Sequence, residues 1–212
     1  MKDSFFDTSV VIHYGSYSKN TQQEPIIKKS YEYIIKKAGK YLLCHYVESE
    51  INNRIRKRRI IYDEALRKIM NLSYEIGSSP ISKELKERDL IYARKIYELN
   101  KKGKAEDVSK IFGQEHAIFE RKLDQFLKFL VDEKLIPIGS IQEELISILH
   151  EFFNNYADCK VLASALQAQE GRSKFYLVAA DKDFDEPGYL FTQEDSRIKK
   201  YQFPELFNLL NK

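Results

Sequence analysis

Short apolar segments, most of them followed by helical patterns, occur near both ends of the chain and constrain its fold more than any other feature. Residues 3–7 and 40–46 (KYLLCHY) have the pattern of buried strands. Three further segments, 134–139 (KLIPIG), 174–180 (KFYLVAA) and 196–203 (SRIKKYQF), predict strands as well. Strands that alternate with helices favour a parallel sheet covered on both faces. We therefore expect an α/β protein with three layers, α/β/α, around a central parallel sheet of about five strands.

Capping residues, prolines and glycines indicate where the helices around these strands begin and end. A small hydroxyl residue, Thr8 or Ser9, predicts that a helix starts directly after the first strand. Pro25 opens a pattern with apolar residues on one side, and Gly39 is expected to end that helix. A terminal helix is expected from Pro204.

The middle of the chain has helical patterns throughout. Residues 47–77 predict one long helix, and residues 81–133 predict further helix with a hinge near Gly103. The segment of about 61–131 is therefore interpreted as an all-helical insertion. Since 212 residues are many for one small domain and few for two, we predict a single domain, 1–212, that contains this insertion.

Charge and cysteine content narrow the class of protein. Charged residues make up 32% of the chain, yet the net charge is only +3, which permits a polyanionic partner without demanding one. Cys44 and Cys159 lie in apolar stretches without metal-ligand spacing, which favours a reducing, intracellular setting. We find no signal peptide pattern, and no apolar run approaches the roughly 18 residues of a membrane span. We expect a soluble cytoplasmic protein with no membrane partner.

Four acidic residues stand where parallel sheets place functional groups, at strand ends and helix starts. Asp7 closes the first strand, and Asp181 closes the fourth in the same way. Asp158 lies early in an Ala-rich helix, and Glu50 lies about two turns beyond the second strand. Each acid alone has an ordinary explanation. An acid at a helix start interacts favourably with the helix dipole, and Glu50, close to Glu48, fits a solvated helix face.

Together the four acids indicate a divalent metal site. Carboxylates that converge on one sheet edge repel one another by up to ~4 kcal/mol for each close pair at an effective dielectric of about 20. Such a cluster persists only if protons or cations neutralise it. Oxygen ligands suit Mg²⁺ or Mn²⁺, whereas zinc would require histidine or cysteine ligands. The predicted metal ligands are Asp7, Glu50, Asp158 and Asp181.

The sequence around these acids resembles the four motifs of PIN-domain nucleases, the family that includes the VapC-type toxins. The four stretches are FFDTSVVIHY, LLCHYVESEI, NYADCKVLASAL and LVAADKDF, which contain Asp7, Glu50, Asp158 and Asp181 in that order. The fourth motif of the family is Thr-x-Asp-x-Asp-Phe, with Thr or Ser at its first position, where this chain has Ala179. The resemblance covers roughly residues 1–60 and 132–212, so the chain is similar to a PIN domain with a large helical insertion.

The resemblance implies a nuclease that hydrolyses phosphodiester bonds of nucleic acid, RNA in preference to DNA, as a toxin-type or RNA-processing enzyme. Its acids would hold one or two Mg²⁺ or Mn²⁺ ions, which lower the pKa of a bound water and neutralise the leaving oxygen. Thr8, Ser9 and Asp183 are then neighbours that orient the acids, although Asp183 fits a turn after the strand equally well. An antitoxin protein and a homodimer are the protein partners that the resemblance suggests.

A basic tract begins directly after Glu50 and offers contacts for nucleic acid. Its cations, which start about one turn beyond the expected metal site, would hold flanking phosphates in a salt-dependent way. Asp63 and Glu64 follow the tract, so a solvated helix face explains it equally well. The basic residues concerned are Arg54, Lys57, Arg58 and Arg59.

Two other classes of protein fit parts of the pattern. A catalytically silent PIN fold, serving as a binding or scaffold module, is favoured by Ala179 and by the insertion, while the presence of all four acids opposes it. A phosphatase of the haloacid dehalogenase type also begins with an Asp that closes its first strand. That family places a second Asp two residues later, where this chain has Ser9, so we set the phosphatase aside.

Overall fold

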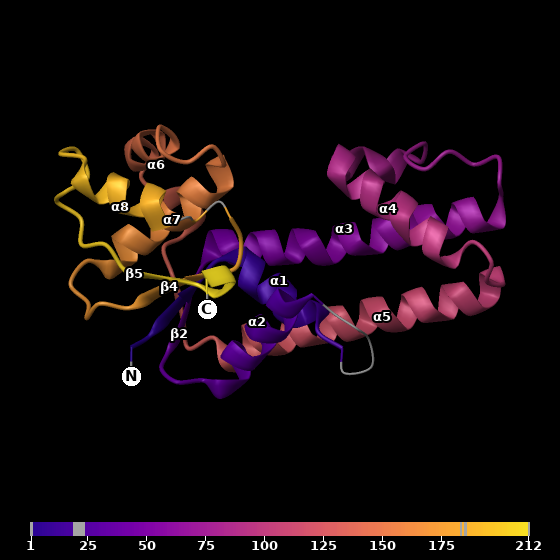
Figure 1. The fold of residues 1–212 in the computed structure, drawn as a ribbon, viewed down its shortest axis with the longest axis horizontal. Helices are drawn as coiled ribbons and strands as arrows, with labels where there is room; N and C mark the ends of the chain where they lie inside the picture. Colours follow the sequence, from indigo (N-terminus) through magenta and orange to yellow (C-terminus); the bar gives the residue numbers. More distant parts are fainter. Residues whose placement is uncertain (1, 19–23, 183, 185, 212) are drawn as a thin grey trace. The chain divides into compact units, whose positions relative to one another are not determined.

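The chain folds into two compact units, which a computed structural model describes. The model describes residues 2–18, 24–182, 184 and 186–211. The first unit comprises Met1–Ile51 and Lys122–Lys212, and the second comprises Asn52–Arg121. The first holds a parallel β-sheet with its helices, and the described elements of the second are all helical (Figure 1). The bounds of the second unit fall before those of the predicted insertion at 61–131.

The sheet of the first unit has five strands, all parallel, in the order β3-β2-β1-β4-β5. The strands are β1 (Ser4–Phe6), β2 (Tyr41–Cys44), β3 (Glu133–Leu135), β4 (Tyr176–Ala179) and β5 (Glu205–Asn208). β1 and β4 pair at the centre, with Phe5 opposite Leu177. The predicted α/β fold with a central parallel sheet of five strands is confirmed.

Helices cover both faces of this sheet, which gives the predicted three layers. They are α1 (Thr8–Ser16), α2 (Pro25–Lys36), α6 (Glu143–His150), α7 (Tyr156–Gln169) and α8 (Glu186–Glu194). α1 and α2 pack together on one face, whereas α6 and α7 lie on the other (Figure 1). Connections between parallel strands are right-handed. The chain crosses the sheet in one direction from β1 to β2 and in the opposite direction from β3 to β4, so the helices of these two connections lie on opposite faces.

The strand order therefore reverses between β1 and β4. In open parallel sheets this reversal leaves a crevice at the carboxyl ends of the two strands, and ligands bind there. Asp7 directly follows β1, and Asp181 lies two residues after β4. The topology thus brings two of the predicted acids to the position where a parallel sheet forms its site.

Local sequence explains where the helices of the first unit begin. The helix α1 starts at Thr8, within the expected Thr8 or Ser9, but its N-cap is Asp7 and not one of these hydroxyl residues. Pro25 is the first residue of α2, where its missing N–H costs nothing. The helix does not continue to Gly39 as expected, because Lys37 already adopts a left-handed conformation with φ of 33°. Asn155 caps α7, and its side chain accepts a hydrogen bond from the backbone N–H of Ala157.

Aromatic side chains dominate the core beneath α1 and α2. Phe5 and Phe6 of β1 are fully buried. Phe6 packs edge-on against Tyr41, with ring centroids 4.8 Å apart, and against Phe126 at 5.6 Å. On the other face, Phe5 stacks on Phe175 at 5.6 Å. Each such ring contributes roughly 1.5–3 kcal/mol through burial, so the central strand that precedes Asp7 is anchored on both faces.

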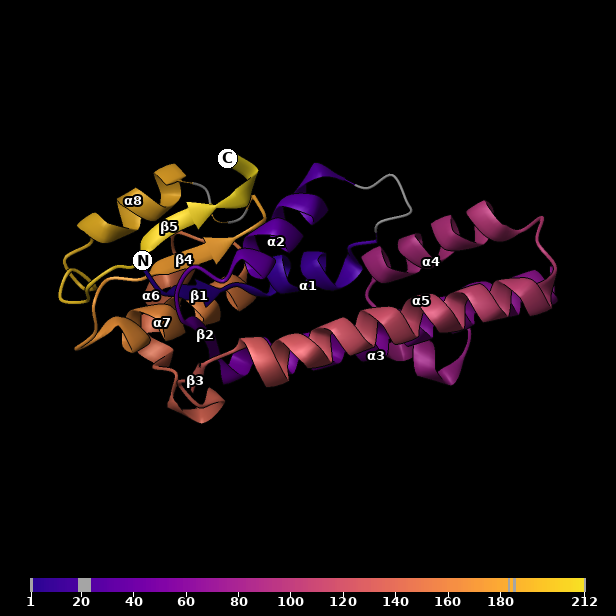
Figure 2. The same ribbon diagram turned by 90° about the horizontal axis from the view of Figure 1, so that it is seen from below.

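The second unit consists of three helices and a 3-10 turn, and Figure 2 shows these helices. They are α3 (His45–Met70), which starts in the first unit, the turn Pro80–Glu84, α4 (Glu87–Asn100) and α5 (Ala105–Gln125). Their apolar cluster includes Ile61 from α3, Ile96 from α4 and Phe112 from α5. The predicted hinge near Gly103 is the connection between α4 and α5. Among the described residues no helix combines the length and apolarity that a membrane crossing requires.

The C-terminal segment differs from the prediction. Residues 196–203 form turns instead of a strand, β5 follows them, and Leu209–Asn211 is a 3-10 turn instead of the helix expected from Pro204. A proline lacks an N–H group, so it is tolerated directly before a strand as well as at a helix start. Here the N–H of Glu205 donates to the carbonyl of the residue before β4 at 2.9 Å, which makes the segment a strand.

Three other boundaries also differ. The long helix α3 ends at Met70, earlier than the predicted 47–77, and the chain then turns. β3 begins one residue before the predicted 134–139 and ends at Leu135, where Ile136 has a positive φ of 49°. α8 was not predicted, because a proline and a glycine near its start are unfavourable in helix interiors.

Candidate metal centre

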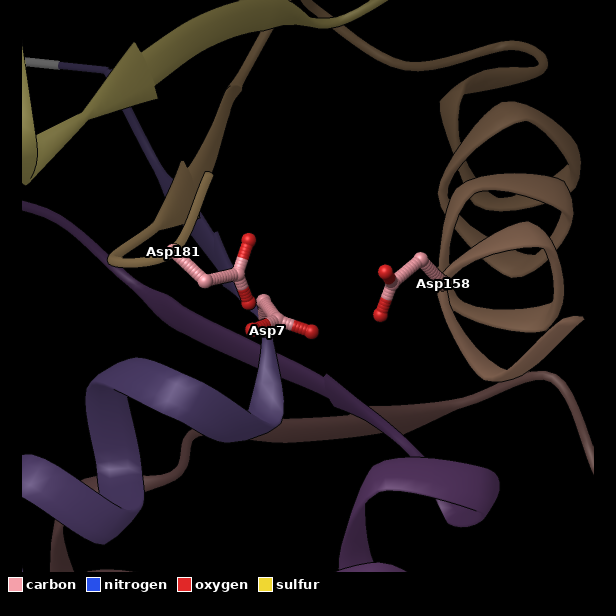
Figure 3. Close-up of side chains that lie close together, drawn as sticks. All are labelled: Asp7, Asp158 and Asp181. Atoms are coloured by element: carbon pink, nitrogen blue, oxygen red, sulfur yellow. The ribbon is translucent and has the colours of Figure 1, made fainter. Parts of the chain in front are cut away.

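Three of the four predicted acids face one another at the carboxyl ends of the central strands. Asp7, Asp158 and Asp181 each offer one carboxylate oxygen, and these oxygens all lie within 4.8 Å of one another. Figure 3 shows the side chains of Asp7 and Asp181 next to each other, with that of Asp158 pointing toward them from α7. Residues from both ends of the sequence thus form one acidic cluster, which we call the acidic triad.

Asp7 is the most buried member of the triad. Its side chain is 2% exposed, and its backbone N–H donates to the carbonyl of Val178 at 2.9 Å, which extends the pairing of β1 with β4. The pKa of Asp7 is raised to about 7, mainly by burial. The negative charges of Asp181 and Glu50 raise it as well, whereas the hydrogen bonds from Ser9 lower it. Burial beside other acids therefore favours either a proton or a bound cation on the Asp7 carboxyl group.

Ser9 connects the two central strands at the site. Its backbone N–H donates to the Asp7 carboxylate at 2.8 Å, and its hydroxyl donates to the same oxygen. The Ser9 hydroxyl also accepts a hydrogen bond from the N–H of Ala180 at 3.1 Å. The motif-based expectation that Ser9 orients an acid therefore corresponds to a direct contact with Asp7.

The loop that carries Asp181 is held by the last strand. The amide of Asn208, at the end of β5, donates to the backbone carbonyls of Asp181 and Phe184, each at 2.8 Å. The N–H of Phe184 donates to the Asp181 carboxylate at 3.4 Å. Asp183, predicted to orient a ligand, lies outside the described residues. Sequence reasoning missed Asn208, because it placed the fifth strand at 196–203.

Asp158 approaches from the other face of the sheet. It lies in the first turn of α7, three residues after the Asn155 cap, and is 7% exposed. The unpaired N–H groups at this end of a helix favour a negative charge. The helix start therefore eases the burial of a carboxylate beside two others.

Glu50 lies beside the triad without joining it. Its Oε2 accepts a hydrogen bond from the Thr8 hydroxyl at 2.5 Å, and its Oε1 accepts one from the Tyr46 hydroxyl at 3.5 Å. Its charge contributes to the raised pKa of Asp7. The predicted role of Thr8 in orienting an acid therefore corresponds to its contact with Glu50. The pair Tyr46 and Glu50 has helical i,i+4 spacing, which the sequence displays.

The donor set of the triad suits a hard divalent cation. Its three groups are all carboxylates, and oxygen ligands of this kind are those that Mg²⁺ and Mn²⁺ prefer. A soft metal would need a thiolate ligand. Burial raises the pKa of the nearby Cys44 thiol to about 11, which disfavours its thiolate form. Mutual repulsion among the buried acids supplies the driving force for cation binding. The residues therefore fit the predicted Mg²⁺ or Mn²⁺.

The basic tract is engaged in contacts within the second unit. Asp89 accepts from the buried Lys57 at 3.3 Å and lies 3.8 Å from an Arg54 nitrogen. The guanidinium of Arg58 stacks over the Phe119 ring, 4.2 Å from its centroid. Arg59 is exposed. Packing within this unit thus accounts for the positions of Arg54, Lys57 and Arg58, and their role in nucleic-acid binding stays a prediction.

Known proteins add nothing to the identification. Comparisons with protein-family models, with curated proteins and with solved structures found no match for this chain. The resemblance to PIN domains therefore stays a prediction that rests on the four motifs.

Proposed function

We propose that this chain is a Mg²⁺- or Mn²⁺-dependent nuclease with a PIN-like site, which hydrolyses phosphodiester bonds, single-stranded RNA being the expected substrate. The observation that carries the proposal is the acidic triad, whose ligand oxygens lie within 4.8 Å of one another at the strand-order reversal of a parallel sheet. The four PIN-like motifs support it independently, because the triad consists of the acids from motifs one, three and four.

Each acid has a separate part in this proposal. Asp7, Asp158 and Asp181 would hold the cation, and Glu50, which accepts a hydrogen bond from Thr8, would serve a second cation or a water molecule. A divalent cation held there would supply charge that polarises the phosphate and lowers the pKa of a water molecule. Ser9 keeps the Asp7 carboxylate in position through its two hydrogen bonds. The chain thus supplies a rigid set of oxygen ligands on strand and helix ends.

A cleavage assay tests this function. Labelled single-stranded RNA and DNA are incubated with the protein in EDTA, Mg²⁺ or Mn²⁺, and the products are examined for 5′-phosphate and 3′-hydroxyl ends. We expect metal-dependent cleavage of RNA by the wild type and by Glu144→Gln, an exposed acid on α6. Asp158→Asn should lose at least about 10²-fold in rate, since it removes a metal ligand. Cation binding without cleavage of either substrate would favour the scaffold module.

The partners that the resemblance suggests belong to the same proposal. An antitoxin would be captured as a stable complex on co-expression with the genes that flank this one. A homodimer would be detected by light scattering at the concentrations used for the cleavage assay. Cytoplasmic location would be checked by fractionating the source cells with an antibody to this chain.

A further inference from the structure

Lys160 lies on α7, two residues beyond Asp158, and its ammonium group sits between two tyrosine rings. Its Nζ is 5.2 Å from the centroid of the Tyr46 ring and 4.9 Å from that of the Tyr156 ring. Both distances are within the roughly 6 Å of cation–π contacts. In the part of the chain that the structure describes, no carboxylate oxygen lies within 4.0 Å of this ammonium group. Two tyrosine rings therefore contact the ammonium group of Lys160, and no acid among the described residues forms an ion pair with it.

Tyr46 ties this lysine to the acidic site. The Tyr46 hydroxyl donates to Glu50 at 3.5 Å, one turn further along α3 within the first unit. Burial raises the pKa of Tyr46, and the negative charges of Glu50 and Asp158 raise it further, so the hydroxyl remains a donor. The ring of Tyr46 thus contacts the Lys160 ammonium group, while its hydroxyl contacts Glu50.

Tyr156 is the second aromatic contact of the lysine. It precedes Lys160 by one helical turn on α7, so the two side chains are neighbours. The Tyr156 hydroxyl donates to Glu143 of α6 at 3.1 Å, and its ring lies edge-on to His150 with centroids 5.6 Å apart. Two contacts from α6 therefore set the position of the Tyr156 ring, and through it the position of the ammonium group.

Resting on the proposed nuclease function, we infer that Lys160 binds a backbone phosphate of the substrate next to the one that is hydrolysed. A polyanion that approaches the acidic triad is repelled, and bound cations offset this only at the phosphate they contact. A neighbouring phosphate needs a positive charge from the protein, and the Lys160 ammonium group, which pairs with no carboxylate of the described residues, supplies it. Lys160 is then a substrate-binding residue at the Glu50 side of the site.

The test separates this role from cation binding. The variants are Lys160→Met, which keeps the length of the side chain, Lys160→Arg, and the control Lys174→Met. Lys174 is exposed and precedes β4, at the amino ends of the strands and away from the triad. Each is placed in the Asp158→Asn background to prevent cleavage, and Kd for a fluorescein-labelled single-stranded RNA is measured by anisotropy at several salt concentrations. Thermal unfolding with Mn²⁺ is recorded for the same substitutions in the wild-type background.

We expect Lys160→Met to raise Kd about five- to tenfold and to reduce the slope of log Kd against log salt by about 0.7, the value for one phosphate on a single strand. Lys160→Arg should retain the slope, and Mn²⁺ should stabilise all variants as it does the wild type. Equal Kd and slope in Lys160→Met and Lys174→Met would overturn the inference while leaving the nuclease intact. Loss of Mn²⁺ stabilisation in Lys160→Met would overturn it in favour of a structural role. A wild type that neither cleaves RNA nor responds to Mn²⁺ would overturn the nuclease itself.

Discussion

The hydroxyl of Ser9 accepts a hydrogen bond from the N–H of Ala180 at 3.1 Å and donates its own proton to Asp7. One side chain thus links the acid that follows β1 to the residue that precedes Asp181. The fourth PIN motif has Thr or Ser where this chain has the buried Ala179. Ser9 provides a hydroxyl at the junction of the same two strands, so the two acids are connected although that motif hydroxyl is missing.

Substitution of this hydroxyl should weaken cation binding. Hydrogen bonds from Ser9 lower the pKa of Asp7, so Ser9→Ala should raise that pKa further and favour the proton over the cation. A hydrogen bond to a charged group contributes about 1.5–3 kcal/mol, which corresponds to roughly a tenfold or greater increase in Kd for Mn²⁺. Calorimetric titrations at pH 6.5, 7.5 and 8.5 measure it. Ser9→Thr keeps the hydroxyl and should bind as the wild type; equal affinity in Ser9→Ala at every pH would contradict this account.

The raised pKa of Asp7 makes the metal-free fold pH-dependent. Its pKa is about 7 in the folded protein against 3.8 ordinarily, so between pH 4 and pH 7 the folded state holds a proton that the unfolded state releases. Stability therefore falls as pH rises through this window, by on the order of 2–4 kcal/mol. In EDTA, the free energy of unfolding of Asp7→Asn minus that of the wild type, measured in urea, should be larger at pH 8 than at pH 5. If this difference is the same at both pH values, Asp7 does not titrate in this window.

Glu64 should be essential to the second unit. It is fully buried and accepts hydrogen bonds from the Tyr74 hydroxyl at 3.0 Å, from the Gly77 N–H at 2.7 Å, and from the Ser79 hydroxyl. Glu64→Ala leaves these donors without an acceptor, which should cost about 2–4 kcal/mol in urea unfolding followed by circular dichroism. The matched change at the exposed Glu75 should stay within about 0.5 kcal/mol. Equal losses in the two variants would rule out this role.

Two glycines should respond to alanine in opposite directions. A Cβ at Gly39 would lie 2.5 Å from the backbone oxygen of Lys2, so Gly39→Ala forces backbone apart and should cost about 1–3 kcal/mol. Gly113 lies in α5 with nothing within 4 Å of the added carbon. Gly113→Ala should therefore stabilise the helix by about 0.5–1 kcal/mol. Melting temperatures of the two variants suffice, and a lower value for Gly113→Ala than for Gly39→Ala would refute the assignment.

The sequence was sufficient for the first four strands of the sheet and for the triad because their signals are local. Each short apolar run stands between helical patterns, and an acid such as Asp7 in that setting has few structural explanations. Parallel topology then brings strand ends together without further information. The β1 and β4 ends could be paired in this way although about 170 residues separate them.

The sequence was insufficient where tertiary packing overrides local pattern. Glu64 follows a basic tract, and a solvated face was one of the two explanations that the sequence left open there, yet Glu64 is fully buried among hydroxyl and N–H donors. Pro204 was interpreted as a helix start, whereas pairing with β4 makes the next residues a strand. Because a helix was expected there, the sequence did not indicate that Asn208 lies at the end of a strand beside the site. Lys160 lacks a sequence signal, because its position depends on a tyrosine from α3 that only the fold brings near.

The central claim is that the acidic triad binds a divalent cation, and thermal unfolding with Mn²⁺ tests it most directly. The proteins are the wild type, Asp181→Asn and the exposed-acid control Glu144→Gln, each melted in EDTA and in rising Mn²⁺. A cation that binds only the folded state stabilises it by about 2.7 kcal/mol at one hundred times Kd, which raises Tm by roughly 5–10 °C at this chain length. We predict that rise in the wild type and the control, and its loss in Asp181→Asn. An equal rise in all three proteins, or none in any, would contradict the metal centre.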